Sequence, residues 1–158
     1  MQSRIRLFGH PVHPMVVHFP IVIFPLLVGL DLLWSLTRTP GLWEVGGWLG
    51  MVGVGGGILA ILTGTVDLAA IPAGSRAHRI AFWHFLCGLS VHTLYILTVW
   101  ARWPVGSPPG RTWVAISIDV LGLGMVILAG YLGSELRDRH HVGVPAVEEG
   151  AEPTALKQ

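Results

Sequence analysis

Three histidines stand close together near the start of the chain, where the sequence becomes strongly apolar. They are His10, His13 and His18, within the segment HPVHPMVVHFP. Imidazole is a common ligand of iron, copper and zinc, and it binds and releases a proton near neutral pH. Ionisable side chains inside such apolar segments are rare, and by default they mark a functional site. The spacing therefore directs attention to cofactor or proton chemistry where the first long element begins.

Four stretches are long and apolar enough to cross a bilayer. A transmembrane helix needs about 20 predominantly apolar residues, and this chain is 52% hydrophobic and only 12% charged. Segments rich in Gly, Pro, Ser and Thr separate the four stretches. We predict an all-α membrane protein, a four-transmembrane-helix antiparallel bundle. Its spans cover about residues 15–36, 46–69, 81–101 and 113–132.

Basic residues predict the orientation of this bundle. Of the 10 Lys and Arg residues, seven fall on the side that holds both termini, and the positive-inside rule places that side in the cytoplasm. We expect a multi-pass protein of the bacterial inner (cytoplasmic) membrane. Residues 1–14 form a cytoplasmic N-terminal segment, residues 15–144 the transmembrane domain, and the polar residues 145–158 a disordered tail.

This topology gathers most of the histidines at the cytoplasmic end of the bundle. At 1.5 Å per residue, His18 and His84 lie roughly 11 Å and 10 Å from the middle of the first and third spans. Two imidazoles at equal depth on different helices suit a b-type haem, whose iron takes one axial ligand on each face. Arg76 and Arg79 are expected to pair with the haem propionates.

A haem-free site is the alternative at the same end. A set of nitrogen and oxygen donors could bind a first-row transition metal ion or handle protons. The candidate donors are His10, His13, His18, His84, Asp67, Glu135 and His140. Two further interpretations stay open. The histidines could be interfacial groups that hydrogen-bond to backbone carbonyls, or the chain could be a structural subunit of a membrane complex.

Three more ionisable residues lie within the spans. His92 lies near the midplane of the third span and Asp119 about one turn further out on the fourth, so we expect a hydrogen bond between them. This pair could also belong to a proton path. Asp31, near the external end of the first span, is expected to reach the interface or to cap a packing contact.

Small residues follow one face of the second span and one face of the fourth. Repeats of small residues every three or four positions let neighbouring helices approach closely, so both faces should point into the bundle. The residues on these two faces are Gly46, Gly50, Gly53, Gly57, Ala60, Gly64 and Asp67, and then Ala115, Asp119, Gly122, Val126, Ala129 and Gly133.

Two segments resemble the ends of a known family. GHPVHPMVVHFPI (residues 9–21) and GYLGSELRDRHHVGV (residues 130–144) are similar to the bacterial four-helix membrane family catalogued as domain of unknown function 2231. The resemblance implies a layout like that of small four-helix membrane cytochromes and a redox or cofactor role. The motif positions that carry over are Gly9, His10, His13, Pro14, His18, Pro20, Gly133, Glu135, His140 and Gly143.

The chain departs from the usual family pattern at the end of the fourth span. Apolar, aromatic and glycine residues are commoner in the family where this chain has Arg137, Asp138 and His141. These changes place more charge at the exit of the span. They leave both His140 and His141 as candidates for the operative histidine.

Taken together, these features predict a small integral-membrane redox protein that passes electrons to a partner. The single cysteine, Cys87, excludes an internal disulfide and a cysteine-based metal cluster. A net charge of +1 gives no reason to expect nucleic-acid binding. The sequence has no phosphate loop, no attached-haem motif and no hydrolase arrangement, so nothing in it supports a hydrolase or a kinase. A redox partner, a larger membrane complex and a homo-oligomer are all compatible with it.

Overall fold

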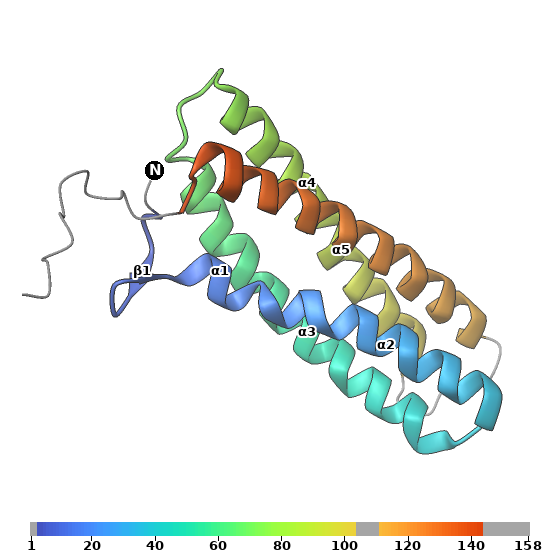
Figure 1. Cartoon of the computed structure of the whole chain (residues 1–158). Coiled ribbons are helices and arrows are strands. Elements are labelled where there is room, and N and C mark those ends of the chain that lie inside the picture. The colour runs from blue at the N-terminus through green and yellow to red at the C-terminus, as the bar shows by residue number, and fades with distance from the viewer. Residues whose placement is uncertain (1–2, 104–110, 144–158) are drawn as a thin grey trace, which may run out of the picture.

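The computed structural model describes residues 3–103 and 111–143 (Figure 1). The predicted disordered tail, residues 145–158, lies outside the described residues. A short hairpin and one turn of helix precede four long helices (Figure 1). The elements are β1 (Arg6–Leu7), β2 (His10–Pro11), α1 (Val12–Val16), α2 (His18–Thr37), α3 (Pro40–Leu68), α4 (Arg76–Arg102) and α5 (Thr112–His140).

Local sequence explains where the long helices begin and end. Pro40 starts α3 at a position where its missing N–H is no loss. Ser75 caps α4, because its hydroxyl oxygen accepts the backbone N–H of His78 at 3.0 Å. Left-handed residues, Arg38 and His141, end α2 and α5.

The helices extend beyond the apolar windows seen in the sequence. The largest difference is in α5, which continues to His140 although the predicted span ends at 132. Its last two turns are polar, and Arg139 pairs there with Glu135 at 3.1 Å, one helical turn away. Polar residues can continue a helix past the bilayer, which hydropathy alone does not reveal.

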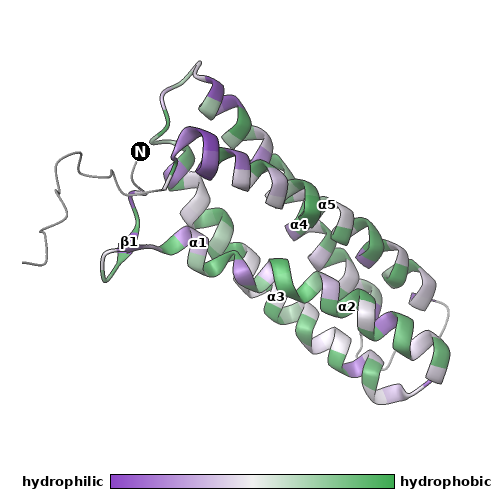
Figure 2. Ribbon diagram, in the orientation of Figure 1, coloured by the Kyte–Doolittle hydropathy of each residue, from purple (hydrophilic) through white to green (hydrophobic). Residues whose placement is uncertain are grey.

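The four long helices form an antiparallel bundle (Figure 1). Helix α2 packs against α3 and α5, and α4 packs against the same two helices. We call one end of the bundle the histidine end; it holds His10, Leu68, Arg76 and His140. The opposite end is called the arginine end; it holds Thr37, Pro40, Arg102 and Thr112. Figure 2 shows hydrophilic residues concentrated at the histidine end, where α4 begins and α5 finishes.

The outer surface of the bundle is apolar. Large side chains such as Leu62, Trp83 and Ile127 are more than half exposed, whereas the core is narrow and centred on Phe24, Leu27 and Tyr95. All four long elements are long and apolar enough to cross a membrane, with α1 and α2 counting as one span. An apolar exterior of this length suits hydrocarbon as its solvent. The predicted fold class, a four-transmembrane-helix bundle, is confirmed.

The glycine-rich face of α3 points into the bundle as predicted. Gly50, Gly53 and Gly57 are buried. A Cβ on Gly53 would lie 2.7 Å from the ring of Tyr95, and a Cβ on Gly50 would lie 2.9 Å from Val99. These glycines therefore provide the space into which side chains of α4 fit.

Candidate functional site

The seven donors proposed from the sequence do not form one metal cluster. Across residues 3–103 and 111–143, no three His, Cys, Asp or Glu side chains come together as a metal site. His10 and His18 are exposed. Glu135 is paired with Arg139. These side chains lie near one another at the same end of the bundle, but they point to different surfaces.

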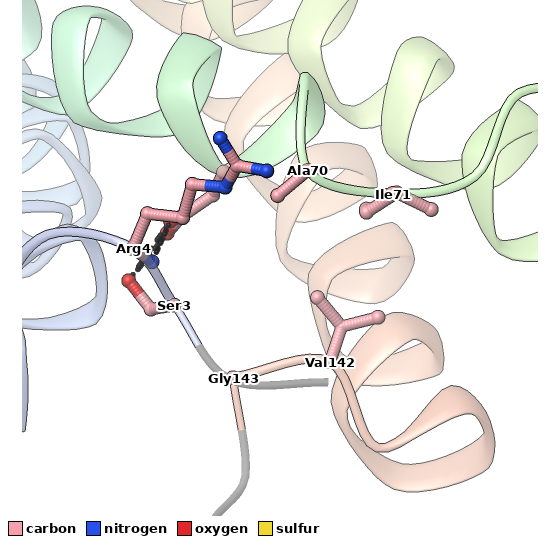
Figure 3. A pocket seen from close by; sticks show the side chains of 7 residues that line it. Ser3, Arg4, Ala70, Ile71, Val142 and Gly143 are labelled. Carbon is pink, nitrogen blue, oxygen red and sulfur yellow. Dashed lines mark hydrogen bonds between the residues drawn. The ribbon is translucent and has the colours of Figure 1, made fainter.

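Asp67 binds the N-terminal segment. Its carboxylate accepts the Ser3 hydroxyl at 2.8 and 2.9 Å and the backbone N–H of Arg4 at 2.9 Å. Figure 3 shows Ser3 and Arg4 on one side of a shallow pocket of about 260 Å³ that is also lined by Ile71 and Val142. The sequence pattern placed Asp67 among the donors, whereas in the structure its oxygens are occupied by this segment.

Two histidines of the predicted set do lie together inside the bundle. The ring centres of His13, on α1, and His84, on α4, are 6.2 Å apart, and the ring planes are nearly perpendicular at 87°. Both side chains are half-buried. They are 71 positions apart in the sequence, so the pair is a product of the tertiary fold.

The two imidazoles are held in the same way. Nδ1 of His13 lies 3.0 Å from the carbonyl oxygen of Ala60 on α3, and Nδ1 of His84 lies 2.9 Å from that of Ala129 on α5. A carbonyl oxygen only accepts, so Nδ1 must carry the proton in both rings. In each neutral ring Nε2 is then left with a free lone pair. This is the tautomer that a metal-binding histidine adopts when its second nitrogen is held by a backbone carbonyl.

Small residues make room for both rings. A Cβ on Gly64 would lie 2.9 Å from the His13 ring, and one on Gly133 would lie 3.2 Å from the His84 ring. Gly64 belongs to the glycine-rich face of α3 and Gly133 to the corresponding face of α5. These two glycines thus position the imidazole pair, a role that the sequence pattern alone assigned to helix packing.

The structure places His13, not His18, beside His84. His18 is the first residue of α2 and is exposed. It follows His13 by five positions, which corresponds to about 140° around a helix, so the two side chains cannot face the same neighbour. The estimate from depth alone ignored this angle, and it selected the wrong residue of the motif as the neighbour of His84.

The remaining residues predicted at the histidine end lie apart from this pair. Arg76 and Arg79 are exposed and line a surface groove between α4 and α5 together with Glu135. His140 is half-buried, and its Nε2 has no hydrogen-bond partner among the described residues. His141 is exposed and ends α5.

A second polar group, missed by the sequence analysis, lies at the arginine end. Nη2 of Arg102 donates to both oxygens of Asp31 at 2.7 Å and also to Oδ2 of Asp119. All three side chains are at most 2% exposed. The Trp43 ring covers the guanidinium, whose central carbon lies 4.1 Å from the ring centre. We call Asp31, Arg102 and Asp119 the buried charge cluster.

The buried charge cluster corrects two expectations. Asp31 does not reach the interface, because it is bound by Arg102 inside the bundle. The expected hydrogen bond between His92 and Asp119 is not formed: Nδ1 of His92 has no hydrogen-bond partner in the described structure, and the His92 ring packs against Gly57 instead. Two acids near the external ends of their spans could have signalled a nearby cation. The sequence count instead places Arg102 with Arg38 and Arg111, the basic residues on the side opposite the termini.

Comparison with known proteins agrees with this architecture. A family model described as predicted membrane protein (DUF2231) matches residues 9–146, which is most of the chain. No curated protein matches, and no solved structure matches.

Proposed function

The chain belongs to the DUF2231 family of predicted membrane proteins, and on this premise we propose that it is a small membrane cytochrome that binds b-type haem between His13 and His84. The assignment of haem to this pair rests on one observation. The two imidazole ring centres are 6.2 Å apart, and both rings carry their proton on Nδ1. Redox chemistry, the iron ligands and the orientation in the membrane all belong to this proposal.

The separation of the rings fits two ligands on one iron. Two imidazoles with ring centres about 6 Å apart could each place one nitrogen on a metal between them, at the roughly 2.0–2.1 Å of metal–imidazole bonds. The observed distance is 6.2 Å. The carbonyls of Ala60 and Ala129 fix both rings with Nε2 unprotonated, which is the state that binds iron.

The number of donors favours haem over a bare metal ion. A protein site for zinc or a similar ion needs three or four side-chain ligands. No third His, Cys, Asp or Glu joins His13 and His84 in the part of the chain that the structure describes. A porphyrin supplies four nitrogens itself and needs only the two axial positions from the protein. Two imidazoles would therefore supply the protein ligands that a haem iron needs, and they are too few for most free ions.

The bound haem would supply a one-electron redox centre. His13 and His84 would hold the iron, and the backbone carbonyls behind them would fix the direction of each ring. A single centre near one end of the bundle cannot carry electrons across the bilayer by itself, so a redox partner is part of the proposal. The predicted pairing of Arg76 and Arg79 with the propionates stays a prediction.

The burial of Arg102 supports a cytoplasmic histidine end. In the sequence, Arg102 counts among the three cations on the opposite side. The structure places it inside the bundle against two carboxylates, so it does not act as a water-facing cation there. The excess of basic residues at the histidine end is therefore larger than the count of Lys and Arg in the sequence gives. This excess favours a histidine end that faces the cytoplasm of a bacterial inner membrane.

A visible spectrum of the purified protein tests the proposal. The full chain is expressed with haem supplied and purified in mild detergent, and a dithionite-reduced minus oxidised spectrum is recorded. We expect sharp α and Soret bands in the wild type, lost in His13→Ala and in His84→Ala because each removes one axial ligand. His18→Ala is the matched control and should keep both bands.

Folding of each variant is checked by size-exclusion chromatography and far-ultraviolet circular dichroism, so that loss of haem is separated from loss of structure. A flat spectrum from folded, haem-supplied wild-type protein would sink the haem assignment. Metal analysis of that protein then decides whether an ion occupies the site. Loss of the bands in His18→Ala, with the bands of His13→Ala unaffected, would identify His18 as the ligand in place of His13.

A further inference from the structure

The buried charge cluster at the arginine end takes no part in the proposed haem site. It joins three helices, since Asp31 lies on α2, Arg102 on α4 and Asp119 on α5. The fourth helix, α3, covers it with Trp43, and Gly46 makes room: a Cβ there would lie 2.8 Å from Nη1 of Arg102. All four helices thus enclose one set of charges.

Two carboxylates meet at a single nitrogen in this cluster. Nη2 of Arg102 contacts both oxygens of Asp31 and one oxygen of Asp119. Because both carboxylates lie within hydrogen-bond distance of the same atom, their nearest oxygens are no more than about 5 Å apart. Like charges at such a distance oppose one another strongly when water is excluded, and paired carboxylates in such sites share a proton.

The charges of the cluster do not balance when both acids are ionised. One guanidinium and two carboxylates give a net charge of −1, in side chains that are at most 2% exposed within an apolar bundle. The other charged groups near this end point elsewhere: Glu44 is exposed, and Arg38 and Arg111 stack on the rings of Trp34 and Trp100.

Unpartnered polar atoms surround the cluster. Oδ1 of Asp119 is buried and has no hydrogen-bond partner among the described residues. The same holds for Oγ1 of Thr98, which is fully buried one turn before Arg102 on the same face of α4. A carboxylate oxygen left bare inside a bundle is unfavourable, whereas a protonated carboxyl carries its own donor and no charge.

We propose that Asp31 and Asp119 together bind one exchangeable proton, which makes the buried charge cluster neutral. The proton belongs to the pair, because both acids face the same guanidinium nitrogen. This gives the protein a proton-binding site at the end opposite the imidazole pair, independent of haem.

Infrared spectroscopy of the purified wild-type protein tests this inference. A protonated carboxyl group gives a C=O stretch that is separate from the amide and carboxylate bands. We expect this band at neutral pH, a shift of the band in D₂O because the proton exchanges, and its loss on titration to alkaline pH.

Two single variants identify the acids. Asp31→Asn and Asp119→Asn should each lose the band completely, because the remaining carboxylate then pairs with Arg102 as a neutral ion pair and needs no proton. Both variants keep the cluster neutral and should fold. Glu44→Gln removes an exposed carboxylate and should keep the band.

Two results would overturn the proposal. Absence of the band in folded wild-type protein at neutral pH overturns the proposal. So does a band that survives in either Asn variant when that variant is folded. Should either variant fail to fold, the D₂O shift and the pH titration of the wild type still decide the question.

Discussion

Gly53 of α3 lies directly against Tyr95 of α4, so closely that a Cβ on Gly53 would lie 2.7 Å from the tyrosine ring. The ring is fully buried and stacks on Phe24 of α2 with ring centres 3.6 Å apart. One glycine thus sets the distance between three helices at the centre of the bundle.

Replacing this glycine should destabilise the protein. In Gly53→Ala the new methyl group meets a rigid buried ring, and overpacking of this kind costs about 1–3 kcal/mol of unfolding free energy. Gly55→Ala is the control, because a Cβ there has nothing within 4 Å and alanine is a better helix former. Reversible unfolding in mixed detergent micelles measures both. Equal stabilities for the two variants would refute the packing role of Gly53.

Tyr95 also anchors the backbone of α2. Its hydroxyl donates to the carbonyl oxygen of Pro20 at 2.6 Å inside the core. Tyr95→Phe keeps the ring and removes this donor, so we expect a loss of about 1–2 kcal/mol in the same unfolding assay. Tyr131, the only other tyrosine, is 63% exposed, and Tyr131→Phe should have no measurable effect. A Tyr95→Phe variant as stable as wild type would contradict this.

The N-terminal segment should loosen when Asp67 loses its charge. Asp67→Asn weakens charge-assisted hydrogen bonds from Ser3 and from the Arg4 backbone. We expect faster amide hydrogen exchange at Arg4 and neighbouring residues, read by mass spectrometry, with exchange in α2 unchanged. Glu135→Gln, which breaks only an exposed pair with Arg139, is the comparison. Unchanged exchange at the N-terminal segment would mean that Asp67 does not hold it.

Removal of Arg102 should be more damaging than removal of either aspartate. Arg102→Met leaves the buried Asp31 and Asp119 without their cation, and breaking a buried ion pair in this way costs about 3–5 kcal/mol. Arg111→Met removes an exposed arginine near the same end and should change stability little. If both variants unfold alike, the buried charge cluster does not stabilise the bundle.

Hydropathy was sufficient to predict the fold. Four apolar stretches of membrane length, separated by turn residues, predicted four helices, and the small-residue repeats on α3 and α5 correctly predicted which faces point inward. The repeat period is a local property, so it can be read from one helix at a time. The polar end of α5 was missed because its last turns carry no apolar signal.

The polar sites were harder to predict because they depend on contacts between helices. Depth along each span matched His18 to His84, but side-chain direction decides which imidazoles meet, and it selects His13 instead. Arg102 was counted only as one of three basic residues on the side opposite the termini, since its two acidic partners lie on helices far away in the sequence. Residues that neutralise each other's charge from different helices leave no recognisable pattern within a single span.

The pairing of Asp31 with Arg102 has a consequence for how the chain is made. The aspartate leaves the ribosome 71 residues before its cation. Alone in lipid, α2 would carry an acid without its cation, which is unfavourable near a span end and costs about 2.5–3.5 kcal/mol at a helix centre. Synthesis therefore leaves Asp31 without its cation until α4 has been made, so the final packing of α2 depends on a helix that is completed later.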